Sequence, residues 1–121
     1  MRLVRQSGLP VFAYSVLGHG FFGGGFKSGD TAAAETLLDG AAKRAYLCDE
    51  NMRRLQRAET LAARDGCSVA QIALRYVLGS PMNVFAVMST KDPARLKENA
   101  RLAGCPLSAQ DCRFLEHGAQ A

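Results

Sequence analysis

The chain has 121 residues, a formal net charge of +4 at pH 7 and a pI near 9.1. Its length suits one domain or part of a larger one, and its hydrophobic content of 48% is ordinary for a globular protein. The sequence has no run of about 18 apolar residues and no secretory signal at its start, so we expect no membrane partner and a cytoplasmic location.

Eleven of the fifteen basic residues are arginine, and they are scattered singly along most of the chain. Arg53, Arg54 and Arg57 are the exception, and we expect them to form a solvated helix face. The high pI alone would favour a nucleic-acid binder, but scattered charges argue against that reading. We therefore expect no nucleic-acid partner.

The four cysteines lie at positions 48, 67, 105 and 112. No pair has the CxxC spacing of zinc sites and redox motifs, so we predict no metal site. In a chain without a secretion signal, such cysteines are expected to be reduced thiols rather than a disulfide framework.

The first half of the chain contains a short apolar run and then a glycine-rich segment. Val11–Ser15 is β-prone and follows Gly8–Pro10, which predicts a strand. Gly18–Asp30 holds six of the twelve glycines and is expected to be a loop. Helix-forming residues follow at 31–38 and 41–46, but without strong periodicity, so this region is consistent with an insertion on a loop.

The second half has clearer signals. Asp49–Arg64 has helical spacing of its apolar residues and ends at Asp65-Gly66. Ser68–Gln71 is a capping box for the next helix, which Gly79-Ser80-Pro81 ends. Asn83–Met88 is apolar at nearly every position, as in a parallel strand that is buried on both faces.

Two more helices are predicted after that strand. The helix over 92–103 places Leu96, Ala100 and Ala103 on one face, and Ser108 caps a last helix with Asp111 at its third position. Strands separated by helices indicate an α/β fold with a parallel sheet. Two strands alone cannot form a stable, doubly covered sheet, so they belong to a larger sheet or other strands are present.

The start of the 92–103 helix has the features of an anion site. Asp92 suits an N-cap and Pro93 the first helical position, and the first turn of a helix carries unpaired N–H groups and a partial positive charge. Ser89, Thr90, Lys91 and Arg95 add polar and cationic side chains. A phosphate site is one reading of this pattern, and an ordinary strand–loop–helix junction with a solvated basic edge is the more common one, because helix N-termini are frequent.

The segment Gly18–Gly23 spells GxGxxG after a predicted strand, which would indicate a dinucleotide-binding fold. Gly24 and Gly25 follow where a helix should open, and no acidic strand end comes about 20 residues later, so we reject that reading. His19 has no acidic residue nearby in the loop, and His117 lies near the C-terminal end of the sequence. No catalytic constellation is therefore indicated, and we expect both histidines to be structural or solvated.

Two segments together resemble the C-terminal part of the aldo/keto reductase family. Ala13–Gly24 reads AYSVLGHGFFGG and is similar to the family's AYSPLGxGFLTG, and Val87–Asn99 is similar to its IPGxxxPxxLxEN. The two lie about 70 residues apart in the family's order. The resemblance also extends to Asp49–Met52 and Cys67–Leu74, so that it covers nearly the whole chain.

The resemblance implies a fold. The family forms a (β/α)8 TIM barrel, in which active sites lie at the carboxyl ends of the strands. Residues 1–121 would then be a partial barrel domain with strands seven and eight, their helices and a terminal helix. A whole barrel usually needs about 250 residues.

The resemblance also implies a cofactor site for NADP(H). Tyr14 matches the aromatic residue that stacks on the nicotinamide ring, and Ser15, Leu17 and Gly18 match residues that line the pyrophosphate. The segment that holds the 2′-phosphate is matched by Ser89, Thr90, Lys91 and Arg95. Glu98 and Asn99 match the pair that contacts the adenine, although Glu98 could equally be a helix-surface charge. Lys91 and Arg95 would favour NADP over NAD, since a dianionic 2′-phosphate gains most from charge-assisted bonds.

The sequence departs from the family pattern in several ways. Val16 replaces the usual Pro, Met88-Ser89 replaces Pro-Gly, and Gly25 stands where the family often has Lys, which weakens the expected grip on the pyrophosphate. The catalytic Asp, Tyr, Lys and His of the family lie on earlier strands and have no match here. No catalytic residue is therefore assigned, and the NADP site is expected to be partial and weak.

These matches predict a C-terminal cofactor-binding fragment of an NADP-dependent aldo/keto reductase that is inactive alone. In the complete barrel the reaction would be hydride transfer between NADPH and a carbonyl or alcohol. The alternative is a non-catalytic binding module or subunit that self-associates or completes a partner chain. A truncated product without a function of its own is a third reading.

Overall fold

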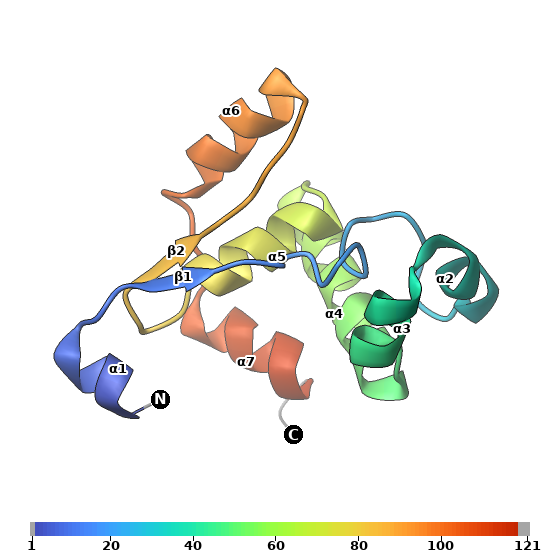
Figure 1. Cartoon of the computed structure of the whole chain (residues 1–121), viewed down its shortest axis with the longest axis horizontal. Coiled ribbons are helices and arrows are strands. Elements are labelled where there is room, and N and C mark those ends of the chain that lie inside the picture. The colour runs from blue at the N-terminus through green and yellow to red at the C-terminus, as the bar shows by residue number, and fades with distance from the viewer. Residues whose placement is uncertain (1, 119–121) are drawn as a thin grey trace.

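The computed structural model describes residues 2–118, which form seven helices and two short strands (Figure 1). In chain order these are α1 (Arg2–Ser7), β1 (Val11–Ala13), α2 (Thr31–Leu37), α3 (Gly40–Tyr46), α4 (Asp49–Asp65), α5 (Val69–Leu78), β2 (Val84–Ala86), α6 (Pro93–Leu102) and α7 (Ala109–His117). The α1 helix was not predicted, and none of its residues is buried.

The two strands pair in parallel, with Val11 opposite Val84, Phe12 opposite Phe85 and Ala13 opposite Ala86. This confirms the predicted parallel sheet with helices in the connection between its strands. Both strands are shorter than predicted. Ser15 has a φ of +56°, a left-handed conformation that is incompatible with continuing β1.

The predicted helix starts are confirmed by their hydrogen bonds. The Ser68 hydroxyl accepts from the Gln71 N–H while the Gln71 side chain accepts from the Ser68 N–H, which completes the capping box of α5. Ser108 caps α7 by accepting from the Asp111 N–H. These helix starts could be predicted because the residues that form a cap lie within four positions of each other in the sequence.

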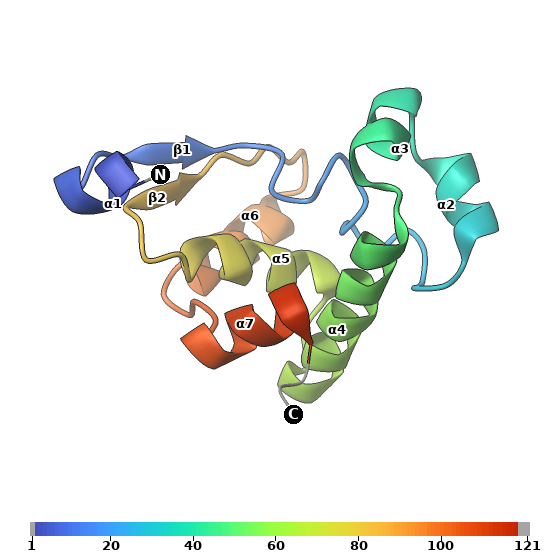
Figure 2. The ribbon, with the colours of Figure 1, turned by 90° about the horizontal axis from the view of Figure 1, so that it is seen from below.

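The core consists of two clusters that meet along α4. Phe21, Phe26, Leu38 and Leu55 belong to the first cluster. The second lies between α4, α5 and α7 and includes Leu61, Ile72, Leu107 and Leu115. Figure 2 shows α2 and α3 on one side of α4 and α5 and α7 on the other.

The region 31–46 is packed into the first cluster rather than attached as a loose insertion. Ala34 on α2 and Ala42 on α3 are fully buried beside the aromatic residues of the glycine-rich loop. The small side chains let these two short helices approach the loop closely. Weak periodicity in the sequence therefore reflects short helices with narrow buried faces.

The prediction of a strand buried on both faces is wrong for this chain. Figure 2 shows α5 and α7 on one side of the strands, and no part of residues 2–118 covers the other side. Phe12 and Phe85 point to that open side, where they are 65% and 49% exposed. The apolar composition of a strand predicts that other elements cover both of its faces. It does not show whether those elements are present among the residues that the structure describes.

The predicted apolar face of α6 is also largely unburied. Leu96 is exposed and Leu102 is the buried residue of this helix, because only the C-terminal end of α6 reaches α5. Figure 1 shows the other end projecting away from the remaining helices.

Within residues 2–118 all four cysteines are free thiols, as expected, and no group of three or more metal-ligating side chains occurs. None of the helices over the same residues is long and apolar enough to cross a membrane.

Candidate functional site

The parallel pairing brings the two resemblance segments to the same edge of the sheet. β1 ends at Ala13 and β2 at Ala86, directly opposite each other. One further bond, from the Val87 N–H to the Ala13 carbonyl at 2.7 Å, ties the strand ends together. Tyr14–Gly18 and Ser89–Arg95 therefore leave the sheet from neighbouring carboxyl ends, which is where ligands bind in α/β folds.

Tyr14 is the first residue of the segment Tyr14–Gly18 and is 79% exposed. Tyr14 directly follows β1, and it also forms part of the wall of a cavity on the helix-covered side of that strand. Ser15 turns the chain sharply, and its hydroxyl lies 3.2 Å from His19 Nε2.

Gly18 is buried in the turn that follows. Its φ is +59°, and a Cβ there would lie 3.4 Å from side-chain atoms of Phe21, Phe22 and Tyr46. Its N–H donates to the Ser15 carbonyl at 2.9 Å, while the Leu17 carbonyl accepts from the Phe22 N–H at 2.9 Å. The Gly18 N–H is thus used inside the loop. The chain continues in turns after Gly23 instead of a helix, in agreement with the rejection of a dinucleotide-binding GxGxxG.

The second segment contains the predicted helix start. Asp92 caps α6 by accepting from the Ala94 N–H at 2.9 Å, and Pro93 occupies the first helical position. The Thr90 hydroxyl in turn accepts from the Asp92 N–H at 3.1 Å. Pro93 has no N–H, and the N–H of Ala94 is hydrogen-bonded to the Asp92 carboxylate. The first turn of α6 therefore has fewer free N–H groups for an anion than the sequence predicts.

The cations of this segment are well placed for an anion from solvent. Arg95 is highly exposed, and its Nε lies 3.8 Å from an Asp92 carboxylate oxygen, which is a loose contact. Lys91 is exposed and has no ion pair within the part of the chain that the structure describes. Together with exposed Ser89, these side chains suit a phosphate group. The contacts would come from the side chains more than from the backbone N–H groups of α6.

Glu98 and Asn99 lie further along α6. The Glu98 carboxylate forms an ion pair with Arg101 one turn later, and its hydrogen bond with that guanidinium lowers the pKa of Glu98. The Glu98 carboxylate is thus ion-paired on the surface of α6 in this structure. Asn99 is half-buried.

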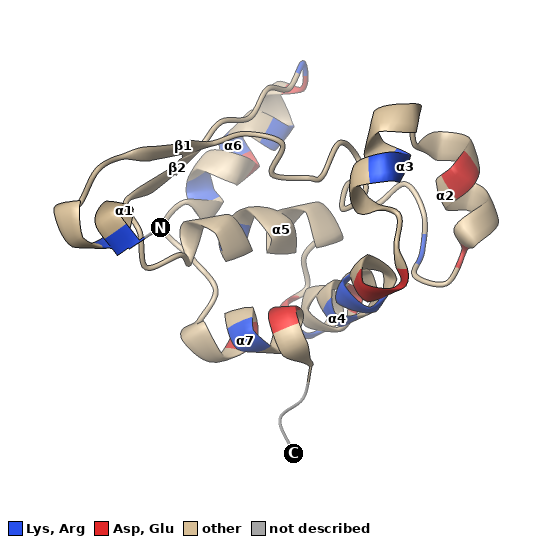
Figure 3. Ribbon diagram, turned by 60° about the horizontal axis from the view of Figure 1, so that its bottom comes forward, with Lys and Arg blue, Asp and Glu red and all other residues tan. Residues whose placement is uncertain are grey.

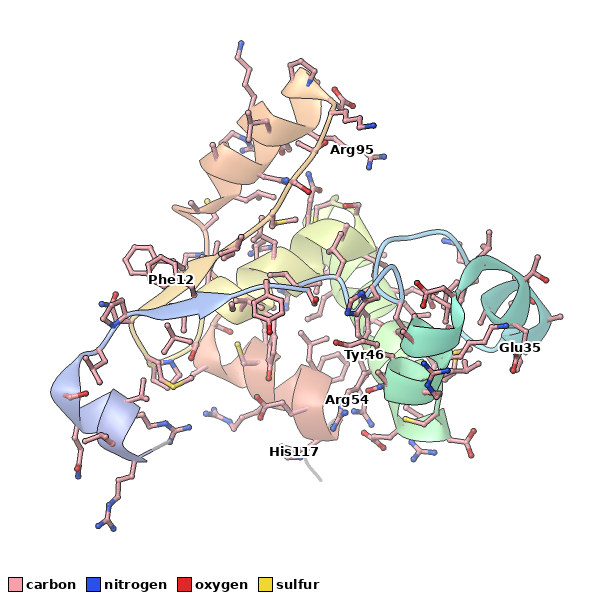
Figure 4. The ribbon with its side chains drawn as sticks, viewed as in Figure 1. Phe12, Glu35, Tyr46, Arg54, Arg95 and His117 are labelled. Carbon is pink, nitrogen blue, oxygen red and sulfur yellow. The ribbon has the colours of Figure 1, made fainter. Side chains whose placement is uncertain are left out.

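The two segments start together but then diverge. In Figure 1 the chain after β1 runs towards α3, whereas the chain after β2 runs to the far end of α6. Figure 4 shows Arg95 at that far end, well away from Tyr46 beside the glycine-rich loop. The structure brings Tyr14 near the start of the second segment, but it does not gather all ten predicted residues around one point.

A cavity of about 530 Å³, which the sequence did not reveal, lies on the helix-covered side of β1. Its wall includes Tyr14 and Ser15 from the strand end, Tyr46 from α3, Arg54 from α4 and Tyr76 from α5. Figure 4 shows Tyr46 and Arg54 close to each other beside the glycine-rich loop. Together with Glu116 from α7, these residues come from five separate elements, so no sequence spacing could have indicated their convergence.

Two side-chain hydrogen bonds lie in the wall of this cavity. The Tyr76 hydroxyl donates to Glu116 at 2.7 Å, and Arg54 donates to the Asn51 side chain at 3.0 Å. Burial and the Glu116 carboxylate raise the pKa of Tyr76 to about 12, so that Tyr76 stays protonated near neutral pH. Arg54 thus lines a cavity, and Arg57, whose side chain is 16% exposed, donates to the Leu115 carbonyl at 3.0 Å. The prediction of a solvated helix face is therefore wrong for these two arginines and holds for the exposed Arg53.

Comparison with known proteins matches the amino-acid sequence of this chain to a family. A family model described as "Aldo/keto reductase family" matches residues 1–117. The chain belongs to the aldo/keto reductase family. This confirms the resemblance of the strand-end segments.

Two curated relatives of this aldo/keto reductase chain show the same family. It is 31% identical over 111 residues to "Probable aldo-keto reductase 1" from Glycine max, which covers 92% of the chain and 32% of that protein. It is 28% identical over 119 residues to "Aryl-alcohol dehydrogenase GME11368" from Pestalotiopsis microspora, which covers 96% of the chain and 28% of that protein. No solved structure matches.

The aldo/keto reductase chain therefore spans about a third of the length of these relatives. Its two parallel strands with connecting helices are consistent with part of a (β/α)8 barrel.

Proposed function

We propose that this chain is the C-terminal cofactor-binding part of an NADP-dependent aldo/keto reductase, with β1 and β2 as strands seven and eight of the barrel. The observation that carries the proposal is the shared edge from which Tyr14–Gly18 and Ser89–Arg95 emerge. In a barrel that edge is the rim where cofactors and substrates bind. The family membership supplies the chemistry, which is hydride transfer between the bound nicotinamide and a carbonyl or alcohol.

The residue roles in this proposal follow from position. The exposed ring of Tyr14 would stack on the nicotinamide, while Ser15, Leu17 and Gly18 would line the pyrophosphate. Lys91 and Arg95, with Ser89 and Thr90, would hold the 2′-phosphate, and Glu98 and Asn99 would contact the adenine. Two exposed cations favour NADP over NAD, because the 2′-phosphate adds two negative charges near them.

Binding by the isolated chain should be weak, since the opposite wall of the site belongs to other strands. We expect NADP⁺ to shift amide resonances of residues 14–18 and 89–95 in a ¹H–¹⁵N NMR titration, with a Kd well above the micromolar range (about −8 kcal/mol). NAD⁺ should shift the 89–95 set less. Perturbations confined to other residues would contradict the assignment.

The Lys91→Ala variant should weaken NADP⁺ binding about three- to tenfold, which is the loss of one exposed charge-assisted contact. Lys97→Ala, which removes an exposed lysine further along, within α6, is the control and should bind like the parent chain. Equal losses in both variants would point to a non-specific charge effect.

The isolated chain should have no reductase activity, because no residue in it matches the catalytic Asp, Tyr, Lys or His of the family. NADPH oxidation with a panel of aldehydes should proceed at the rate of the enzyme-free control. Turnover above that rate, lost on Lys91→Ala, would contradict this part of the proposal.

The open side of the sheet favours a second candidate function. Phe12 and Phe85 stack there at 5.4 Å between ring centroids, exposed to solvent. An exposed aromatic face between two unpaired strand edges is typical of an association surface. The chain would then act as a non-catalytic module that binds a further polypeptide.

A further inference from the structure

The turn that follows β1 places a nucleophilic side chain next to a base. The Ser15 Oγ lies 3.2 Å from the Nε2 of His19, four residues later in the chain. The His19 ring also packs against Tyr46 on α3, with 5.9 Å between the ring centroids. When the imidazole carries its proton on Nδ1, Nε2 accepts the hydrogen of the Ser15 hydroxyl, which is how a serine nucleophile is paired with its general base. The proposed cofactor site does not use His19.

Both residues of this pair have an unusual backbone conformation. The φ angles are +56° at Ser15 and +52° at His19, and these are the only residues other than glycine with a positive φ within residues 2–118. Such left-handed conformations cost free energy when the residue has a side chain, and they are concentrated at functional sites. A sharp, strained turn directly after a strand also presents the serine nucleophile of α/β hydrolases. The backbone therefore holds Ser15 in a conformation that suits a nucleophile.

Free backbone N–H groups and a cavity lie beside the Ser15 hydroxyl. The N–H groups of Val16 and Leu17 donate no hydrogen bond within the described part of the chain. The N–H of the residue after a serine nucleophile is a usual donor to the oxyanion of acyl transfer. Ser15 and Val16 both line the cavity of about 530 Å³ on the helix-covered side of β1.

The wall of this cavity favours an uncharged ligand. Apolar residues contribute much of it, including Ala13, Phe22 and Ile72. Two of its polar side chains are already engaged, since Arg54 donates to Asn51 and Tyr76 donates to Glu116. An apolar acyl group therefore suits the space next to Ser15 better than a charged one.

We propose that Ser15 and His19 form a catalytic dyad that hydrolyses uncharged esters of short carboxylic acids. The Ser15 Oγ attacks the ester carbonyl carbon and gives its proton to His19 Nε2, while the Val16 N–H is available to the developing oxyanion. The bond to the alcohol oxygen then breaks, and His19 returns the proton to the leaving group. Water next attacks the acyl-Ser15 ester while His19 takes a water proton. The carboxylic acid leaves as that proton returns to the Ser15 Oγ.

The dyad has no acidic third member. The sequence contains no Asp, Glu, Lys or Arg between Arg5 and Lys27, and Figure 3 shows β1 and the chain directly after it without charged residues. In serine hydrolases an acidic residue orients the histidine, and its removal lowers kcat by about 10⁴. Packing against Tyr46 is what orients the His19 ring here. We therefore expect slow turnover and accumulation of the acyl-Ser15 intermediate.

The test uses the whole chain, p-nitrophenyl acetate and no nucleotide. We expect a burst of p-nitrophenolate and, by mass spectrometry of peptides, an acetyl group on Ser15. Ser15→Gly should lower the rate about tenfold or more because it removes the nucleophile, while glycine adopts a φ of +56° readily. Ser15→Gly that is as fast as the parent chain, or acetylation at other residues only, would overturn the proposal.

Histidine variants separate the dyad from a general reaction of exposed imidazoles with this ester. His19→Asn should abolish the acetylation of Ser15, and asparagine tolerates the left-handed conformation at this position. His117→Asn removes the other histidine of the sequence, which is also exposed, and as the matched control it should keep the parent rate. Equal losses in both variants would overturn the dyad. Circular dichroism checks that each variant is folded, and the acetylation of Ser15 in the parent chain depends on no variant.

This inference goes beyond the cofactor proposal and does not rest on it, although Ser15 takes part in both. The ester assay contains no NADP(H), and the NMR titration with NADP⁺ contains no ester. Nucleotide binding without ester cleavage would overturn the dyad and leave the cofactor assignment in place. Acetylation of Ser15 in a chain that does not bind NADP⁺ would have the opposite meaning.

Discussion

At the scale of single residues, the best-defined contacts lie far from the candidate cofactor site. Arg64 on α4 donates to both carboxylate oxygens of Asp111 on α7 at 2.9 Å. Asp65 accepts from Arg64 and Arg75, at 2.7 Å in each case, and Arg75 also donates to the Cys105 carbonyl at 2.7 Å. The network joins α4, α5 and α7 at their solvent-facing ends.

This network should make stability depend on pH through Asp65. Hydrogen bonds from Arg64 and Arg75 lower its pKa from 3.8 to about 2, so the folded state favours the ionised carboxylate. The contribution is present above the unfolded pKa and disappears as pH falls through about 2. Asp65→Asn should cost about 1 kcal/mol at pH 7, a value discounted for its partial exposure.

Urea unfolding at pH 7 and at several values between 4 and 2 measures this effect. The parent chain should lose stability across that interval more steeply than Asp65→Asn. Glu35→Gln, in an exposed pair with Lys43, is the control and should keep the parent's slope. Identical slopes for the parent and Asp65→Asn would show that Asp65 does not carry the effect.

At the scale of elements, helix boundaries were predictable because caps are local. Ser68, Asp92 and Ser108 each accept from a backbone N–H two or three residues later, as their positions indicated. The burial of a helix face was not predictable in the same way. Leu96 has the spacing of a buried residue but remains exposed, because α6 meets α5 only at its C-terminal end.

Removal of one cap tests how much these local signals contribute. Ser68→Ala removes the hydroxyl that accepts from the Gln71 N–H, one of the two bonds of the capping box, and we expect it to lower the free energy of unfolding by about 1 kcal/mol. Thr60→Ala is the control: its hydroxyl donates to the Gln56 carbonyl within α4, and alanine is the better helix former there. A Ser68→Ala chain as stable as Thr60→Ala would show that α5 does not need its cap.

At the scale of the whole molecule, the two core clusters divide the chain into parts that share α4. The first contains the glycine-rich loop with α2 and α3, and the second contains α5 and α7. Leu55 is fully buried in the first cluster and Ile72 in the second. A substitution that creates a cavity in one cluster should therefore first increase local unfolding in the part of the molecule around that cluster.

Hydrogen exchange should resolve this division. Leu55→Ala creates a cavity that costs about 2–5 kcal/mol, and we expect faster exchange in α2 and α3 than in α5 and α7. Ile72→Val, a milder change of about 1 kcal/mol, should affect α5 and α7 more. Uniform acceleration in both variants would mean that the chain opens as a single unit.

The sequence by itself determined the helix caps, the parallel order of two strands and the residues that resemble a cofactor site. These depend on contacts within a few residues or on the alternation of strands and helices. It also indicated that the strands belong to a larger sheet, since their residues are apolar on both faces.

Only the tertiary structure decided which of those signals are satisfied within the chain. Phe12 and Phe85 stay exposed. The Gly18 N–H donates to the Ser15 carbonyl within its own loop. The Asp92 side chain accepts from the Ala94 N–H, so this amide at the start of α6 is not free to bind an anion. The cavity beside Tyr46 and Tyr76 likewise depends on five elements that meet only in space. The physical reason is that burial and convergence result from packing between distant segments, whereas caps and strand propensity are fixed locally.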